Sequence, residues 1–227
     1  VLDNRGYGCI NRLQRATGIF MTGGFFLGPR DFYERLRTMP PQDLAKIDMT
    51  RIDFINQLYG NEELKRAQRR KARFMNTTMI VTLLGAAASD ALESGQVVSG
   101  VGGQYNFVAM SHALPDARLI MMLRATHDNK DGLRSSIVWN YGHVTIPRHL
   151  RDVVVTEYGI AELRGQPDGE VVKRLLAIAD SRFQQDLLNE AKQHQKIAAD
   201  YEIPERFRNN TPQHIAGEML CSQAGIR

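Results

Sequence analysis

Short apolar segments alternate with polar and amphipathic segments along most of the chain. The apolar segments are rich in valine, isoleucine and aromatic side chains, which is typical of buried strands. Val153–Thr156 is the plainest example, because its consecutive β-branched residues favour an extended backbone. The expected strands fall within residues 17–28, 77–84, 95–103, 118–124, 135–139, 144–146 and 153–156.

Helices are predicted between most of these strands. Pro29 stands at the favoured first turn of one helix, and residues 210–212 (Asn-Thr-Pro) form a good start for the last one. The expected helices cover residues 29–37, 62–73, 105–113, 160–164, 170–179, 182–195 and 213–220. Residues 86–92 are interpreted as a short helix or a turn, and residues 127–134 as a polar loop.

The alternation of strands and helices predicts an α/β fold. In this fold a layered open sheet, mixed or mostly parallel, is flanked by helices. No internal repeat and no low-complexity linker divides the 227 residues. We therefore expect one domain over residues 1–200 and a helical extension over residues 201–227.

Composition restricts the class of protein and its expected location in the cell. Hydrophobic residues make up 43% of the chain and charged residues 24%, so a packed core in a soluble protein is expected. Cys9 and Cys221 are too far apart in the sequence to indicate a disulfide framework or a zinc site, which favours a cytoplasmic location. The apolar run 79–84 is far shorter than the ~20 residues of a membrane span. No signal peptide is visible at the N-terminus. The first residue is Val1 and not Met, so the chain is expected to be part of a longer protein.

The net charge of +4 comes largely from a basic run at residues 65–73. The simplest interpretation is the solvated face of a helix. A phosphate-binding patch and a nucleic-acid contact are the alternatives. Since no aromatic residue lies within the run, nucleic acid is the weaker of these two.

A glycine-rich segment is the first candidate for chemistry. Gly100, Gly102 and Gly103 stand with Gln104 immediately before a predicted helix. Free backbone N–H groups at such a position attract anions and carbonyl oxygens. The spacing matches neither a dinucleotide-binding fingerprint nor a P-loop, and a purely structural turn remains an equal alternative.

The second candidate is the end of the strand at residues 153–156. There Glu157 and Gly159 precede a predicted helix, and a carboxylate in this place can act as acid or base. Alternatively, Glu157 caps that helix or pairs with Arg164. The six histidines show no ligand spacing, so no metal site is expected. Ser99 is a conceivable nucleophile, but no histidine base can be assigned to it, and no serine-hydrolase elbow is present.

Four segments together resemble the C-terminal domain of the acetyl-CoA hydrolase/transferase family. They are NTTMIVTLLG at residues 76–85, SGVGGQYNFVAMSHA at 99–113, SSIVWNYGHVTIPRHLRDVVVTEYGIAELRG at 135–165 and IADSRF at 178–183. The resemblance spans about residues 23–191. The GxGGQxxF loop, the TxPR motif and the VVTEYGxAxLRG run make it specific in combination.

The resemblance implies a CoA-transferase-like domain that moves CoA between carboxylic acids or hydrolyses an acyl-CoA thioester. In the family a glutamate attacks the thioester and later holds CoA covalently. The matching position here is Ile80, and a second acidic position is Thr82. Substrates would be an acyl-CoA and a small carboxylic acid, without a covalently bound cofactor or a metal. The family's active site lies between two halves, so an N-terminal domain or a second copy is expected as partner.

Three interpretations follow from the isoleucine. The chain is an enzyme whose catalytic group comes from elsewhere, such as Glu157 acting on water, or a residue of a missing N-terminal half. Alternatively it binds or scaffolds acyl-CoA without turnover. A third possibility is a shifted alignment, in which Asp90 or Glu93 takes the role of Ile80. CoA phosphates would meet Arg134, Arg148, Arg151 or the basic run, and backbone N–H groups at Gly103 and Gly159 are candidates to hold an oxyanion.

Overall fold

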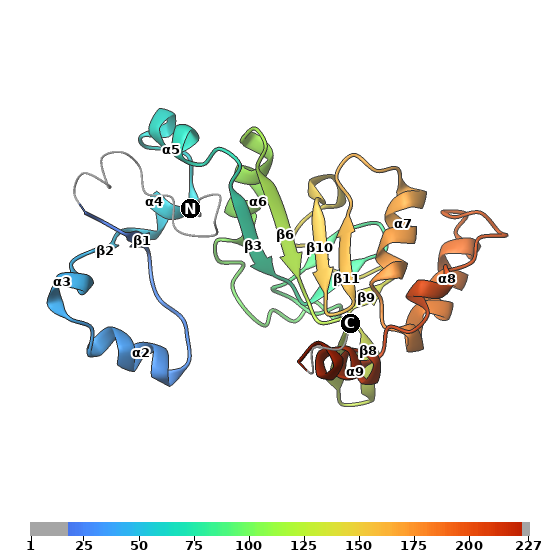
Figure 1. Ribbon diagram of the computed structural model, residues 1–227. Helices are drawn as coiled ribbons and strands as arrows, with labels where there is room; N and C mark the ends of the chain where they lie inside the picture. The colour runs from blue at the N-terminus through green and yellow to red at the C-terminus, as the bar shows by residue number, and fades with distance from the viewer. Residues whose placement is uncertain (1–17, 224–227) are drawn as a thin grey trace. The chain divides into compact units, whose positions relative to one another are not determined.

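The computed structural model describes residues 18–223, with side chains up to residue 217. The chain divides into two compact units, which are described separately. The first unit consists of Val1–Phe74 and Asn106–Arg118, and the second of Met75–Tyr105 and Leu119–Arg227. Figure 1 shows the elements of both in sequence colours. The prediction about Cys9 lies outside the described residues.

The first unit contains a small parallel pair of strands and short helices. Strands β1 (Met21–Gly23) and β2 (Ile47–Met49) pair in parallel. The helices are α2 (Arg30–Arg37), α3 (Pro41–Leu44), α4 (Ile52–Asn56) and α5 (Glu62–Gln68). The prediction of a long buried strand over residues 17–28 is wrong, because only β1 is extended and paired. Phe25 and Leu27 are 66% and 86% exposed. Glycines within the segment interrupt the strand.

The basic run is not the fully solvated helix face that we expected. Helix α5 ends at Gln68, and Lys65 and Arg69 are buried. The Lys65 ammonium donates to the backbone oxygens of Gln57 at 2.9 Å and Tyr59 at 2.7 Å. Burial, and then the neighbouring Arg69, lower the pKa of Lys65. These two cations therefore stabilise the first unit and are not free to bind phosphate.

The second unit is built on a four-stranded sheet in the order β11-β10-β6-β3. The strands are β3 (Arg73–Thr77), β6 (Arg118–Met122), β10 (Val153–Thr156) and β11 (Gly159–Glu162). Strand β10 runs parallel to β6 and antiparallel to β11, so the sheet is mixed. Helices flank it (Figure 1). The predicted α/β class is confirmed.

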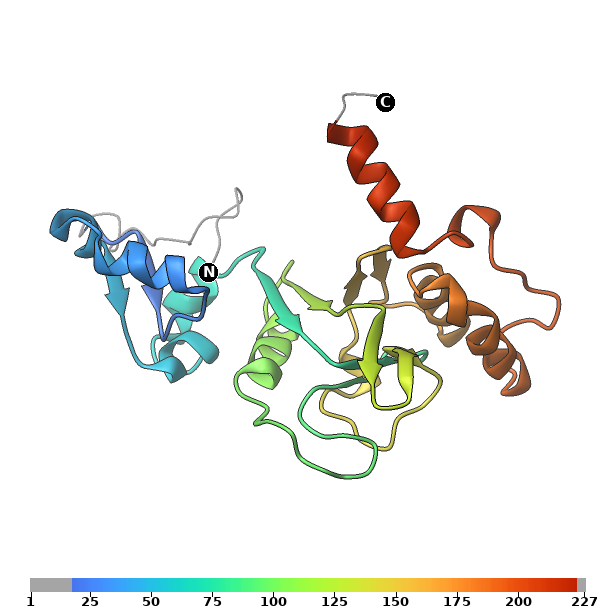
Figure 2. The ribbon, with the colours of Figure 1, turned by 90° about the horizontal axis from the view of Figure 1, so that it is seen from below.

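Two C-terminal helices complete the core of the second unit. Helix α7 (Asp168–Ala177) packs against β11, and α8 (Ser181–Gln193) lies beside α7 in both views (Figures 1 and 2). Helix α7 buries Val171, Val172, Leu175 and Leu176. Each such side chain stabilises the fold by about 1.5–3 kcal/mol. Asp180 begins α8, because its carboxylate accepts the Arg182 N–H at 3.0 Å.

Residues 160–164 were predicted to be helical, which is wrong. They belong largely to β11, which returns from β10 after a two-residue turn at Glu157 and Tyr158. Gly159 pairs with Thr156 and has φ +156°, and a Cβ there would meet Ile178 Cγ2 at 3.2 Å. The turn thus needs glycine for both its backbone angle and its close packing. Antiparallel pairing, which local helix preference does not report, decides the structure here.

A three-stranded sheet and a hairpin lie beside the main sheet. The three strands are β5 (Ala87–Ala88), β4 (Ile80–Thr82) and β9 (Ile137–Val138) in that order. The hairpin consists of β7 (Thr126–Asn129) and β8 (Gly132–Ser135). The predicted loop at residues 127–134 and the helix or turn at 86–92 are therefore wrong.

The remaining predictions have mixed outcomes. Within residues 95–103 and 144–146 the structure has only isolated bridges, Ala91 to Val97 and Ala87 to Ile146. Helices α6 (Gln104–Ala113) and α9 (Pro212–Gln223) confirm the predicted ones. Two short 3-10 turns, η1 (Arg148–Leu150) and η2 (Glu205–Phe207), complete the order.

The domain boundary at residue 200 stays a prediction. Between residues 18 and 223, no helix is long and apolar enough to cross a membrane.

Candidate functional site

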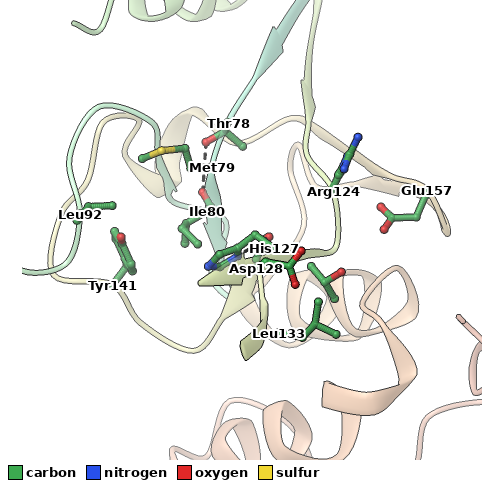
Figure 3. A pocket seen from close by; sticks show the side chains of 12 residues that line it. Thr78, Met79, Ile80, Leu92, Arg124, His127, Asp128, Leu133, Tyr141 and Glu157 are labelled. Carbon is green, nitrogen blue, oxygen red and sulfur yellow. Dashed lines mark hydrogen bonds between the residues drawn. The ribbon is translucent and has the colours of Figure 1, made fainter. Parts of the chain in front are cut away.

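A cavity of about 700 Å³ lies in the second unit, where β4, the β7–β8 hairpin and the β10–β11 turn meet. Figure 3 shows Arg124 and Glu157 on one side of it and Leu92 and Tyr141 on the other, with Ile80 and His127 between them. The lining residues are Thr78, Met79, Ile80, Leu92, Arg124, Thr126, His127, Asp128, Leu133, Ser136, Tyr141 and Glu157. Aliphatic, cationic and anionic side chains thus face one space.

Ile80 lines this cavity, although only 5% of the residue is exposed. Strand β4 places it there, since Ile80 pairs with Ala88 on one side and Val81 pairs with Ile137 on the other. A second cavity of about 1070 Å³ shares Ile80 and is lined further by Trp139, Phe183 and Leu187. The position that the resemblance assigns to the attacking carboxylate therefore faces solvent-accessible space with an apolar side chain.

Glu157 also lines the cavity, carried by the two-residue turn between β10 and β11. Its Oε2 accepts the N–H of Ala125 at 2.8 Å. The alternative interpretations of Glu157 are wrong, because no helix follows it and Arg164 pairs with the buried carboxylate of Asp152 at 2.6 Å. Sequence positions 80 and 157 thus meet at one site.

The glycine-rich loop does not line either of these two cavities. Of the four residues predicted there, Gln104 is linked to the first cavity through the neighbour of a lining residue. Its side-chain N–H donates to the oxygen of Thr77 at 2.7 Å, and Thr78 lines the cavity. The roles of Gly100, Gly102, Gly103, Gln104 and Gly159 in binding a ligand stay predictions.

Two of the arginines expected near CoA phosphates are engaged within the fold. Arg148 and Arg151 contact the carboxylate of Asp168 at 3.0 and 3.2 Å, and Arg151 also donates to the Leu84 oxygen at 2.7 Å. Burial alone would raise the pKa of Asp168, but the two arginines outweigh it and lower that pKa. Arg134, in contrast, is exposed and lines the second cavity.

Sequence reasoning missed Arg124. It lies two residues after the end of strand β6, lines the first cavity and is exposed. Within residues 18–223 its guanidinium forms no ion pair or side-chain hydrogen bond. An arginine at the end of a buried strand was the signal that could have indicated it. Such a group is suited to bind a carboxylate or phosphate.

Sequence reasoning also missed a histidine–serine pair. His127 on β7 and Ser136 after β8 both line the first cavity, and His127 Nδ1 lies 3.0 Å from Ser136 Oγ. His127 is exposed, whereas Ser136 is 2% exposed. The pairing was hidden because residues 127–134 were predicted to be a loop. A hairpin brings the two residues together.

The shifted alignment finds no support at Asp90. Its carboxylate binds His143 Nε2 at 2.9 Å and the Thr145 hydroxyl, and it lines neither cavity. The hydrogen bonds from Thr145 and then His143 lower the pKa of Asp90. Glu93 lines the second cavity only. Across the described part of the chain, no three His, Cys, Asp or Glu side chains form a group that could hold a metal ion.

Comparisons with known proteins agree with the resemblance. The family model "Acetyl-CoA hydrolase/transferase C-terminal domain" matches residues 28–191. The 4-hydroxybutyrate coenzyme A transferase of Clostridium kluyveri is 27% identical over 74% of this chain and 37% of that protein. The succinyl-CoA:cyclohexane-1-carboxylate CoA transferase of Geobacter metallireducens is 29% identical over 84% of this chain and 41% of that protein.

Solved structures agree as well. The crystal structure of RipA from Yersinia pestis matches with a TM-score of 0.65 and 27% identity, over 85% of this chain and 40% of that one. The chain therefore spans about two fifths of the length of the relatives it matches.

Proposed function

Because this chain belongs to the acetyl-CoA hydrolase/transferase family, as a C-terminal domain, we propose that it binds an acyl-CoA thioester in the cavity beside Ile80. The family carries out CoA transfer or acyl-CoA hydrolysis. For this chain we propose one of these two reactions. The thioester is the substrate, a small carboxylic acid is the acceptor or product, and no covalently bound cofactor takes part.

One observation carries the proposal. Ile80, the position that the resemblance assigns to the family nucleophile, and Glu157, from the VVTEYG run, line the same cavity although 77 positions separate them in the sequence. Motifs that specify a family are expected to meet where its ligand binds. Neither motif alone indicated a cavity.

The lining gives each part of an acyl-CoA a suitable environment. Arg124 in the first cavity and Arg134 in the second are exposed cations that would bind phosphate or carboxylate groups. Trp139, Phe183 and Leu187 would receive an acyl chain. The thioester would then lie near Ile80, which belongs to both cavities.

A second candidate function is acyl-CoA binding without turnover, and Ile80 favours it. An aliphatic side chain provides neither a nucleophile nor a proton acceptor. In either case we propose a partner, since the chain covers about two fifths of its relatives. The partner would be an N-terminal domain or a second copy of this chain. A cytoplasmic location stays a prediction.

Calorimetric titration of the full-length protein with CoA and acetyl-CoA tests the proposal. The same protein is assayed for release of free thiol from acetyl-CoA and for exchange of CoA onto a labelled carboxylic acid. Saturable binding with thiol release or exchange supports the enzyme, and binding alone supports the binding module. Absence of binding to either compound would exclude both.

A further inference from the structure

We infer that Ser136 is a nucleophile and His127 its base, so that this cavity hydrolyses the thioester and does not transfer CoA. The inference rests on the proposed acyl-CoA function of the same cavity. It names the group that takes the place of the carboxylate missing at Ile80.

The strand register places the serine directly beside the missing carboxylate. Val81 pairs with Ile137 in parallel strands, and the Val81 N–H donates to the Ser136 oxygen at 2.9 Å. Ile80 on β4 and Ser136, immediately before β9, are therefore neighbours in this register, and both line the first cavity. The hydroxyl that could replace the missing carboxylate thus lies immediately before the neighbouring strand β9.

The tautomer of His127 decides which of the two side chains donates the hydrogen bond. A serine hydroxyl is both a donor and an acceptor. Within the described chain the Ser136 hydroxyl has one side-chain partner, His127 Nδ1 at 3.0 Å. No carbonyl oxygen of the described chain accepts from Nδ1, so we assign His127 the tautomer protonated at Nε2, in which the Ser136 hydroxyl donates to a free Nδ1. A nucleophile within hydrogen-bond reach of a free imidazole nitrogen is the arrangement that activates serine.

The accessible part of Ser136 faces the reaction space. The residue is 2% exposed and lines the cavity, so what surface it has is turned to the cavity. His127 is exposed at the same place on strand β7. Charged neighbours are present on the packed elements: Arg134 opposite His127 on β8, Asp128 next to it, and Arg124 and Glu157 across the cavity.

The first step acylates the serine. The Ser136 oxygen attacks the thioester carbonyl carbon while the hydroxyl proton passes to His127 Nδ1. The carbon–sulfur bond then breaks, and Nδ1 returns the proton to the departing thiolate, so that free CoA leaves. Arg124 and Tyr141, on opposite sides of this cavity, each carry a hydrogen-bond donor, and one of them would serve the negative carbonyl oxygen.

The second step releases the acid. Water gives a proton to His127 Nδ1, and its oxygen attacks the ester carbonyl carbon. The bond to the Ser136 oxygen breaks, and the serine recovers its proton. The sum is acyl-CoA plus water giving a carboxylic acid plus CoA, with no other reactant.

This route separates hydrolysis from transfer. CoA transfer requires the acceptor acid to become activated, which a mixed anhydride with an enzyme carboxylate provides. An acyl-serine ester is too weak an acyl donor to activate a free carboxylate. Ser136 therefore predicts thiol release without exchange of CoA onto an added acid.

The test compares three variants of the full-length protein. Ser136→Ala removes the nucleophile. His127→Asn retains a polar atom near the Nδ1 position but no base, which protects the fold. His112→Asn is the matched control, since His112 is also exposed and its Nδ1 lies 3.1 Å from Ser111 Oγ, outside both cavities. Thiol release from acetyl-CoA, CoA exchange onto labelled acetate, and calorimetric CoA binding are measured for each.

We expect Ser136→Ala and His127→Asn to lower kcat for thiol release at least ~100-fold, with CoA binding retained and His112→Asn unchanged. Unaltered turnover in Ser136→Ala, or efficient CoA exchange in the wild type, would overturn the inference and leave the proposed function intact. Binding without any turnover would also overturn it. Lack of CoA binding by the wild type would instead exclude the proposed function.

Discussion

Two histidine–serine pairs in this protein have nearly equal contact distances but differ in chemistry. His127 Nδ1 lies 3.0 Å from Ser136 Oγ in the second unit, and His112 Nδ1 lies 3.1 Å from Ser111 Oγ on helix α6. In both pairs the imidazole is exposed and the serine is buried. By distance and burial alone they are the same motif.

Their remaining partners separate them. The Ser111 hydroxyl donates to the Val108 oxygen at 2.7 Å, and His112 Nδ1 also contacts that oxygen at 3.0 Å. A carbonyl oxygen only accepts, so Nδ1 of His112 carries a proton and cannot act as a base for Ser111. His127 Nδ1 has no carbonyl partner within the described residues, and its serine lines a cavity. The full set of hydrogen bonds therefore decides which pair can react.

The largest effect is expected from changing Ile80, the residue beside the His127–Ser136 pair. Ile80→Glu would place a carboxylate where Ile80 is 5% exposed, so we expect a loss of unfolding free energy on the order of 3 kcal/mol. It would also supply the carboxylate that the resemblance assigns to this position. CoA exchange onto labelled acetate should therefore appear.

Ile80→Gln is the control for this change, because it has nearly the same shape without the charge. Denaturant unfolding and the exchange assay are run on both variants. Equal exchange in the two variants would show that a carboxylate at position 80 does not change the chemistry. The proposal that His127 and Ser136 replace the carboxylate missing at position 80 would then be contradicted.

A substitution outside the lining of both cavities should lower the stability of the fold without altering either histidine–serine pair. The buried Asp180 accepts the Tyr158 hydroxyl at 2.7 Å and pairs with Arg182 at 2.7 Å. Burial alone would raise the pKa of Asp180, but hydrogen bonds from Arg182 and Tyr158 lower it. Asp180→Asn should cost about 2 kcal/mol of unfolding free energy at pH 7.

The pH dependence of that difference follows from the lowered pKa. The stability that the carboxylate contributes is complete above its unfolded pKa of about 3.9 and is lost as the pH falls through the folded value. The unfolding free energies of the wild type and Asp180→Asn should therefore converge as the pH falls below about 4. A constant difference over that range would contradict the assignment.

Arg124 gives an intermediate effect confined to the cavity. Because this arginine lines the cavity and is exposed, Arg124→Ala should raise KM for acetyl-CoA about tenfold and leave thermal stability nearly unchanged. Arg37→Ala, at an exposed arginine of helix α2, is the control and should not alter KM. A KM for Arg124→Ala equal to that of the control would remove Arg124 from the binding site.

The smallest effect is expected at the Ser111–His112 pair of helix α6. Ser111→Ala deletes a buried hydroxyl that donates to a backbone oxygen, so it should cost about 1 kcal/mol of unfolding free energy. Its kcat for thiol release should equal that of the wild type. A drop in kcat comparable to that of Ser136→Ala would break the distinction between the two pairs.

The sequence predicted those elements in which local pattern and pairing agree. The β-branched run of β10, the strand β6 and the helices α7 and α8 have the predicted type within a few residues. It failed where a tight turn set the structure. Strand β11 and the β7–β8 hairpin both follow from two-residue turns and cross-strand pairing, which hydrophobic periodicity does not detect.

The candidate site was predictable only in part, for the same reason. The family resemblance identified Ile80, the end of the strand at residues 153–156 identified Glu157, and both line the cavity. Arg124 and His127 lie outside the four segments of the family resemblance, and Ser136 lies within the third of them but outside its quoted motifs. The β7–β8 hairpin and the parallel pairing of β4 and β9 bring His127 and Ser136 to Ile80. The glycine loop is prominent in the sequence, yet it lines neither of the two cavities. The most conspicuous motif in the sequence therefore lies outside the cavity lining, while residues that the sequence did not single out lie within it.

Peptide mass mapping after rapid acid quenching tests the central claim most directly. Full-length protein in excess is mixed with acetyl-CoA, quenched within the first turnover, digested and analysed. The account predicts an added acetyl group on the peptide that contains Ser136, absent from Ser136→Ala. CoA bound to a peptide that contains Glu157, with Ser136 unmodified, would contradict it.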